Sequence, residues 1–167
     1  VGVVAGLLTW NFPLLNLAYK LGPALAAGCS IVFKVSHHTP LASLRVAEVI
    51  DSVAFPKGTV NILTGEPKRV SDTLAKSTIP RLLTTIGSTF AGKKLIEQSA
   101  TSIKRFSLEL GGDAPVVIFE DADLENAVEA VVNLKMANAG QICVAPNRIY
   151  IHNSLYDTFI EKASESV

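Results

Sequence analysis

Cys143 is the residue best suited to covalent chemistry, and it stands in the loop-forming stretch Gly140-Gln141-Ile142-Cys143-Val144-Ala145-Pro146. A cysteine thiolate can attack an electrophilic carbon and form a covalent intermediate. A lone cysteine is more often a small buried hydrophobic residue, and we expect Cys29, at the end of a predicted helix, to be one. Gly140 and Pro146 favour an irregular loop in which the thiol is exposed and the backbone N–H is unpaired. Cys143 therefore keeps two interpretations, a buried small residue or a nucleophile.

Two other polar side chains also allow two interpretations each. Glu109 lies in Leu108-Glu109-Leu110-Gly111-Gly112, at the end of an apolar strand. A carboxylate is costly to bury there unless it is paired or protonated, which suits a general base, but Glu109 could also face outward from an edge strand. Asn11 lies in Trp10-Asn11-Phe12-Pro13, just before a predicted helix. It could cap that helix or donate its side-chain N–H to an oxyanion.

A cofactor phosphate could be held where predicted strands end. Gly87-Ser88-Thr89-Phe90-Ala91-Gly92 ends a strand and opens a helix, and a helix N-terminus with glycine and hydroxyl residues favours phosphate. The stretch is neither the dinucleotide GxGxxG fingerprint nor a Walker loop. Lys34 ends another strand, where its ammonium could reach a ribose hydroxyl or a phosphate. Both features also occur in proteins that bind no nucleotide.

Short β-branched runs alternate with longer segments of helical period. The predicted strands are Val1–Leu8, Ser30–Val35, Val60–Thr64, Leu82–Ile86, Phe106–Leu110, Val116–Phe119 and Arg148–His152. The predicted helices are Pro13–Ala27, Leu41–Val53, Lys68–Lys76, Phe90–Ala100, Leu124–Asn138 and Leu155–Ser164.

This alternation predicts an α/β fold, an open parallel sheet with helices on both faces, built from four βαβ units in residues 1–110. Gly111-Gly112 and the nearby Pro115 mark a domain junction, after which residues 111–167 begin a second α/β domain. Ligands of open parallel sheets bind at the carboxyl ends of the strands. That rule selects the following turns: Thr9–Pro13, Lys34–His38, Thr64–Glu66 and Gly87–Gly92.

The composition excludes several classes of protein. Fifteen basic and fifteen acidic residues give no net charge, so we expect no nucleic-acid partner. No apolar run reaches the roughly 18 residues of a membrane helix, so we expect no membrane partner. Histidines and cysteines lack metal-ligand spacing, which predicts no metal site. Two distant cysteines fit a reducing compartment, here taken as the cytoplasm. The chain opens on a strand and ends in a helix, so we expect an interior segment of a longer protein.

Six stretches, in this order and spacing, resemble the aldehyde dehydrogenase superfamily along essentially the whole chain. They are Trp10-Asn11-Phe12-Pro13, Gly22-Pro23-Ala24-Leu25-Ala26-Ala27-Gly28, Lys34 with Thr39-Pro40, Gly87-Ser88-Thr89 with Gly92, Leu108-Glu109-Leu110-Gly111-Gly112, and Gly140-Gln141-Ile142-Cys143. The resemblance implies that residues 1–110 form a Rossmann-like NAD(P)-binding domain. It also implies that residues 111–167 begin the catalytic domain.

The resemblance implies an oxidation of an aldehyde to a carboxylic acid, with NAD or NADP as cofactor. Cys143 would be the nucleophile, Glu109 the base, and Asn11 the oxyanion donor, while Lys20 matches a lysine near the site. The implied cofactor contacts are Thr9, Trp10, Lys34, Ser36, His37, Gly65, Gly87, Ser88, Gly92, Leu110 and Gly111. The substrate would be a small-molecule aldehyde and the parent protein a homodimer or homotetramer, whereas we expect the segment alone to be inactive.

The sequence departs from the family pattern at two informative positions. The family often has Lys-Pro-Ser-Glu where this chain has Lys34-Val35-Ser36-His37. The glutamate that usually holds the ribose hydroxyls and repels a 2′-phosphate is thus replaced by His37, so we expect NADP to be accepted. Tyr19 stands where succinate-semialdehyde members tend to have an arginine, which favours an uncharged aldehyde. Gly112-Asp113-Ala114-Pro115 is closer to the semialdehyde branch, so these positions do not identify the aldehyde.

Three other functions were weighed against aldehyde oxidation. An acylating dehydrogenase or acyl-phosphate reductase of the same superfamily would tend to lack a base at Glu109. A cofactor-independent cysteine hydrolase needs a histidine beside the thiol, and the nearest in sequence is His152. A binding protein without activity is disfavoured because Cys143, Glu109 and Asn11 are all present.

Overall fold

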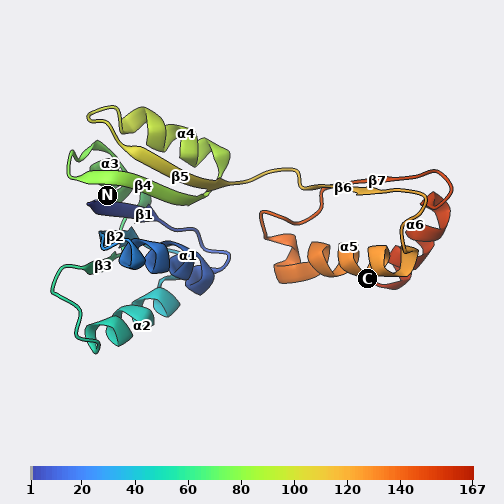
Figure 1. Cartoon of the computed structure of the whole chain (residues 1–167), viewed down its shortest axis with the longest axis horizontal. Helices are drawn as coiled ribbons and strands as arrows, with labels where there is room; N and C mark the ends of the chain where they lie inside the picture. The colour runs from blue at the N-terminus through green and yellow to red at the C-terminus, as the bar shows by residue number, and fades with distance from the viewer. Residues whose placement is uncertain (1) are drawn as a thin grey trace. The chain divides into compact units, whose positions relative to one another are not determined.

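The computed structural model describes residues 2–167, and the chain divides into two compact units, Val1–Leu110 and Gly111–Val167. The first unit contains a five-stranded sheet in the order β3-β2-β1-β4-β5, with every neighbouring pair parallel (Figure 1). Its strands are β1 Val3–Leu7, β2 Ser30–Lys34, β3 Val60–Leu63, β4 Pro80–Gly87 and β5 Arg105–Leu110. Its helices are α1 Pro13–Ala26, α2 Pro40–Asp51, α3 Pro67–Lys76 and α4 Thr89–Gln98.

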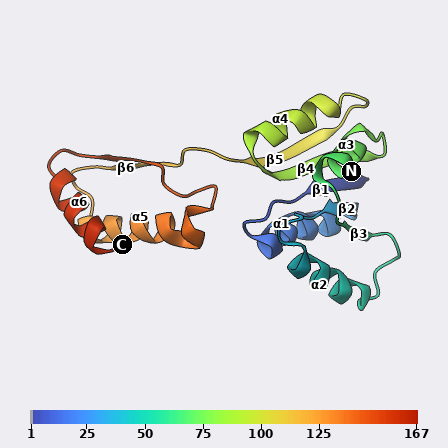
Figure 2. The same ribbon diagram turned by 180° about the vertical axis from the view of Figure 1, so that it is seen from behind.

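Helices cover both faces of this sheet (Figure 1, and from behind in Figure 2). Successive strand residues point to opposite faces, and neighbouring residues of β1 accordingly join different cores. Val4 belongs to a cluster with α1 and α2 residues, among them Leu17. The next residue, Ala5, belongs to a cluster with α3 and α4 residues, among them Leu95. The predicted open parallel sheet with helices on both faces is confirmed.

The strand order contains a reversal that matters for ligand binding. From β1 the chain winds outward through β2 to β3, and then returns to place β4 on the other side of β1. The carboxyl ends of β1 and β4 therefore flank a topological switch point, where open α/β sheets bind their ligands. The hydroxyl of Thr85 in β4 donates to the Leu7 carbonyl at the end of β1 over 3.0 Å, which ties the two strand ends together.

The second unit is a βαβ motif followed by one more helix. Its elements are β6 Pro115–Ile118, α5 Leu124–Met136, the short 3-10 helix η1 Ala137–Gly140, β7 Arg148–Ile151 and α6 Tyr156–Glu165. Strands β6 and β7 are parallel, and Ile118 forms a core with Val131 of α5 and Phe159 of α6. Val117 and Tyr150, by contrast, remain 58% and 53% exposed. One face of this small sheet is therefore covered within the unit and the other is not.

The predicted boundaries agree with these elements to within a few residues, with one informative difference at α5. We expected this helix to run to Asn138, but it ends at Met136. Asn138, Ala139 and Gly140 all have positive φ, at 50°, 56° and 74°, so the α-helix cannot continue through them. The chain thus turns sharply just before the segment that contains Cys143.

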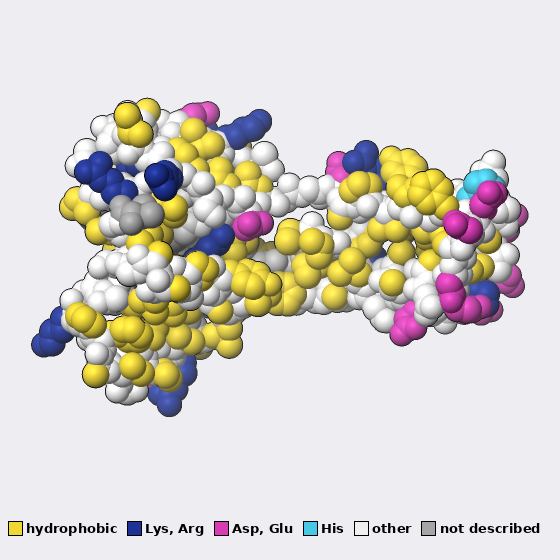
Figure 3. All heavy atoms as spheres, viewed as in Figure 1, with side chains coloured by type: hydrophobic (Ala, Val, Ile, Leu, Met, Phe, Trp, Pro, Cys, Tyr) yellow, Lys and Arg dark blue, Asp and Glu magenta, His cyan; other side chains and the backbone are white. Residues whose placement is uncertain are grey.

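Large hydrophobic side chains are exposed on both units, as the yellow areas of Figure 3 show. None of the helices in residues 2–167 is long and apolar enough to cross a membrane. Cys29 and Cys143 are both unpaired.

Candidate active site

The first unit gathers most of the predicted site residues at one edge of its sheet. The strands are parallel, so the turns that follow β1, β2, β3 and β4, and the end of β5, all lie at their carboxyl ends. The predicted residues at this edge are Thr9, Trp10, Asn11, Lys34, Ser36, His37, Gly65, Gly87, Ser88, Glu109 and Leu110. Lys20 is not among them, because it lies about two helical turns into α1, at 3.6 residues per turn.

Asn11 does not cap α1, so the helix-cap interpretation is wrong. The N-cap residue is Phe12, whose side chain makes no capping hydrogen bond. The Asn11 side-chain carbonyl instead accepts a hydrogen bond from Nδ2 of Asn16, over 3.2 Å. The Asn11 amide is therefore held by a side chain one turn into α1.

Lys34 is the buried cation of this edge. Its side chain lies at the end of β2 and only 5% of the residue is exposed. Burial lowers the pKa of Lys34 from its ordinary value, while the negative charge of Glu66 partly opposes that effect. Its ammonium forms no hydrogen bond or ion pair within residues 2–167. The Lys34 nitrogen therefore still reaches solvent, because no buried side-chain nitrogen or oxygen in residues 2–167 lacks a partner, and its three N–H groups can donate to a polar ligand.

His37 lies beside Lys34 but is exposed to solvent. Partial desolvation lowers the pKa of His37 below 6.5, and the charges of His38 and Lys34 lower it further, whereas Glu66 raises it. The ring centroids of His37 and His38 are 3.8 Å apart. The lowered pKa reduces the positive charge of His37 near neutral pH.

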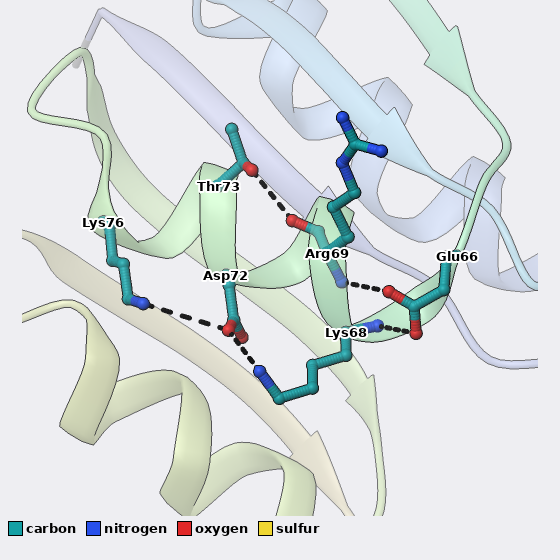
Figure 4. Close-up of a pocket in the computed structure, with 6 residues that line it drawn as sticks. All are labelled: Glu66, Lys68, Arg69, Asp72, Thr73 and Lys76. Atoms are coloured by element: carbon teal, nitrogen blue, oxygen red, sulfur yellow. Dashed lines mark hydrogen bonds and ion pairs between the residues drawn. The ribbon is translucent and has the colours of Figure 1, made fainter.

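Glu66 supplies the negative charge at this end of the sheet. It follows β3 and caps α3, accepting hydrogen bonds from the backbone N–H groups of Lys68 and Arg69 over 3.0 and 2.5 Å (Figure 4). These two bonds lower the pKa of Glu66, which keeps it anionic. The shallow groove in Figure 4 continues along the exposed side of α3, where Asp72 pairs with Lys68 over 2.9 Å. No predicted catalytic residue lines that groove.

The turn after β4 combines a helix cap with a close packing contact. Ser88 caps α4 and its hydroxyl oxygen accepts from the Ala91 N–H over 3.1 Å. The hydroxyl hydrogen can still donate, and the first turn of α4 contains no acidic residue, so the helix end suits an anion. Gly92 is buried, and a Cβ atom there would lie 2.9 Å from Leu110 Cδ2. Gly92 thus lets α4 approach the end of β5.

Glu109 is exposed within residues 2–167, so the interpretation of this carboxylate as buried between two leucines is wrong and the outward-facing interpretation holds. Strand β5 is at the edge of the sheet, where it pairs only with β4, and Glu109 lies beside Ile86. Leu108 packs against the core formed with α3 and α4, so alternation along the strand turns Glu109 to the opposite face of the sheet. Gly111 follows β5 in the second unit, and nothing lies within 4 Å of a Cβ atom built on it.

Cys143 is exposed in the second unit, so the buried interpretation of this cysteine is wrong. It lies in a turn closed by the Ala145 N–H, which donates to the Ile142 carbonyl over 3.1 Å. The following Ala145 and Pro146 are buried and anchor the turn. The Cys143 N–H forms no hydrogen bond within residues 2–167. Cys29 is 3% exposed and joins the core, as expected.

The sequence analysis missed Asn16, and it named Glu66 and Thr39 only as members of a turn and of a family stretch, without their contacts. Asn16 holds Asn11, Glu66 acts on Lys34, and the Thr39 hydroxyl donates to the Trp10 carbonyl over 3.2 Å. The signal that could have found Asn16 is that an amide on the apolar side of an amphipathic helix needs a partner. No group of three or more His, Cys, Asp or Glu side chains in residues 2–167 could hold a metal ion.

The open parallel sheet and its switch point place the first unit in the doubly wound class of α/β folds. The sequence profile described as the aldehyde dehydrogenase family matches residues 1–167, and the chain belongs to this family.

Relatives include the NADP(+) succinate-semialdehyde dehydrogenase of Escherichia coli K12, which is 44% identical over 100% of this chain and 35% of its own length. A glutarate-semialdehyde dehydrogenase of Pseudomonas aeruginosa is 43% identical over 100% of this chain and 35% of its own length.

Solved structures of aldehyde dehydrogenases also resemble this chain. A crystal structure described as an E. coli NADP-dependent enzyme matches with a TM-score of 0.96 and 44% identity, over 99% of this chain and 34% of that one. Betaine aldehyde dehydrogenase of Staphylococcus aureus in complex with NAD+ matches with a TM-score of 0.94 and 40% identity, over 99% and 33%. This chain therefore spans about a third of the length of these relatives.

Proposed function

We propose that the parent protein oxidises an aldehyde to a carboxylic acid with NAD or NADP as hydride acceptor. The observation that carries the proposal is the family match along all 167 residues, together with an exposed Cys143 whose backbone N–H is unpaired within the described residues. In this proposal residues 1–110 are the cofactor-binding domain. Residues 111–167 begin the catalytic domain.

The residues at the carboxyl edge fit a dinucleotide cofactor. The Lys34 ammonium, which has no hydrogen-bond partner within residues 2–167, would hold a ribose hydroxyl, together with Ser36 and His37. The Ser88 hydroxyl and the first turn of α4 would hold the pyrophosphate. The remaining contacts in this proposal are Thr9, Trp10, Gly65, Gly87, Leu110 and Gly111, and Gly92 acts by bringing α4 against Leu110.

The chemistry follows from the residue types. The Cys143 thiolate adds to the aldehyde carbon, and the Asn11 amide and the Cys143 N–H donate to the resulting oxyanion. NAD(P), held by the residues at the carboxyl edge, would supply the hydride acceptor for that carbon, and Cys143 would then carry the substrate as a thioester. Glu109 then takes a proton from water, whose oxygen attacks the thioester and releases the carboxylic acid and the thiolate. We also propose that Lys20 lies near this site, without assigning it a step of the reaction.

The other functions are less well supported. Glu109 is present as a base for hydrolysis, which argues against transfer of the acyl group to another acceptor. A cysteine hydrolase would need a histidine at the thiol, but the His152 ring contacts Ser154 over 2.8 Å and Glu120 over 3.6 Å. We further propose that the parent is a homodimer or homotetramer in the cytoplasm.

Steady-state formation of NAD(P)H by the full-length parent tests the proposal. The panel should contain a semialdehyde with a terminal carboxylate, an uncharged aliphatic aldehyde and betaine aldehyde, each with NAD and with NADP. We expect turnover that produces the free acid without coenzyme A or phosphate. Turnover only with an acyl acceptor, or ester hydrolysis without any nucleotide, would instead support the alternatives.

A further inference from the structure

Asn16 is a buried amide in the second turn of α1, with 5% of its surface exposed. It lies next to Leu17, a core residue, on the side of the helix that packs against the sheet. A buried amide has to find hydrogen-bond partners, because an unsatisfied polar group in the core is costly. Both partners of Asn16 lie in the turn between β1 and α1: the Thr9 carbonyl at 3.5 Å and the Asn11 side-chain oxygen at 3.2 Å.

The orientation of this pair follows from the Thr9 carbonyl. A backbone carbonyl can only accept, so the amide nitrogen of Asn16 must face it, and the oxygen of Asn16 cannot. The second hydrogen on that nitrogen then points to Asn11, which must present its oxygen. The nitrogen end of the Asn11 amide is consequently turned away from Asn16.

We infer that Asn16 is a positioning residue that sets the orientation of the Asn11 amide, so that Asn11 Nδ2 rather than Oδ1 is presented to the oxyanion. This inference rests on the proposed function, in which Asn11 is the oxyanion donor. An amide that flips would place its oxygen, and therefore a negative dipole end, against the developing charge. A donor held in place before the reaction needs no reorganisation when that charge appears.

A double-mutant cycle in the full-length parent tests the inference, with Asn16→Leu as the first substitution and Asn11→Ala as the second. Asn16→Leu removes the donor and keeps an apolar side chain of similar size; Asn16→Met is a second version should the first fold poorly. We expect Asn16→Leu to lower kcat by about tenfold with little change in KM, the scale of coupling between contacting residues. Asn11→Ala should lower kcat by about 10²–10³-fold. The double variant should be no slower than Asn11→Ala alone.

The matched control is Asn61→Leu, which removes another structural amide of the same sheet. Asn61 Nδ2 donates to the Gly58 and Ile31 carbonyls over 2.9 and 3.4 Å, near the amino end of β3 and away from the carboxyl edge. Its loss should lower the melting temperature without changing kcat. If Asn11→Ala turns over normally, the proposed role of Asn11 fails. If Asn11→Ala is slow while Asn16→Leu keeps wild-type kcat, or the two losses multiply in the double variant, the positioning role of Asn16 is refuted.

Discussion

The ring of Phe33 lies directly over Gly6, on the neighbouring strand of the sheet. A Cβ atom at Gly6 would come within 2.7 Å of both Cδ1 and Cε1 of that ring. Phe33 is fully buried and pairs with Gly6 in the register of β1 and β2, so the ring has no space into which to move. The glycine is thus required by packing at the centre of the sheet.

Gly6→Ala should therefore destabilise the protein. Overpacking of a buried site costs about 1–3 kcal/mol, and we expect a corresponding fall in the free energy of unfolding measured by urea denaturation of the full-length parent. Gly22→Ala is the matched control, because nothing lies within 4 Å of its new methyl group. Equal stabilities of the two variants would contradict the packing role of Gly6.

Cys143→Ala should abolish aldehyde oxidation while leaving cofactor affinity close to that of the wild type. The thiol forms the covalent bond to substrate, whereas the proposed cofactor contacts lie mainly in the first unit. NAD(P)H formation measures the first effect and calorimetric titration with NAD or NADP the second. Cys29→Ala, in the core, should keep its activity. An inactive Cys29→Ala beside an active Cys143→Ala would overturn the assignment of the nucleophile.

Glu109→Gln should stall hydrolysis of the thioester. General base catalysis contributes about 10²–10⁴-fold, so a rapid burst of NAD(P)H followed by a slow steady state is expected in stopped-flow absorbance. Glu97→Gln serves as the control, because Glu97 is an exposed carboxylate of the same unit that pairs with Lys94. Unchanged turnover in Glu109→Gln would reduce Glu109 to a surface residue of the edge strand.

Cofactor choice should depend on His37 and on pH. Protonated His37 would favour a 2′-phosphate, and its pKa lies below 6.5 because of desolvation and the neighbouring His38 and Lys34. The ratio of kcat/KM for NADP over NAD should therefore be flat at neutral pH and rise as the pH falls below 6.5. His37→Glu should shift the ratio at least tenfold towards NAD, because like charges in contact cost several kcal/mol.

His152→Gln is the control for this measurement, since His152 lies in the second unit and contacts Ser154 and Glu120. A ratio that His37→Glu leaves unchanged, or a wild type that rejects NADP at every pH, would show that His37 does not face the ribose.

The sequence alone was enough to predict the alternation of strands and helices and the parallel sheet. Apolar β-branched runs, and the glycines and prolines between them, are local signals that need no distant partner. The end of α5 was predicted two residues too late, because Asn138 and Ala139 adopt positive φ. Asparagine tolerates this conformation, but alanine rarely adopts it, so the surrounding structure must impose it at Ala139.

The residue types of the site could likewise be identified from the sequence, since Cys143, Glu109 and Asn11 stand in recognisable stretches. Their surroundings were decided only by the tertiary structure. The return of the chain to β4 places the turn with Ser88 beside the turn with Asn11, and the edge position of β5 leaves Glu109 exposed. The contact of Asn16 with Asn11 and the charge of Glu66 near Lys34 depend in the same way on how segments pack. Residue type and hydrophobic period can be read from the sequence itself. Burial, hydrogen-bond direction and electrostatic coupling cannot, because they arise between groups that only folding brings together.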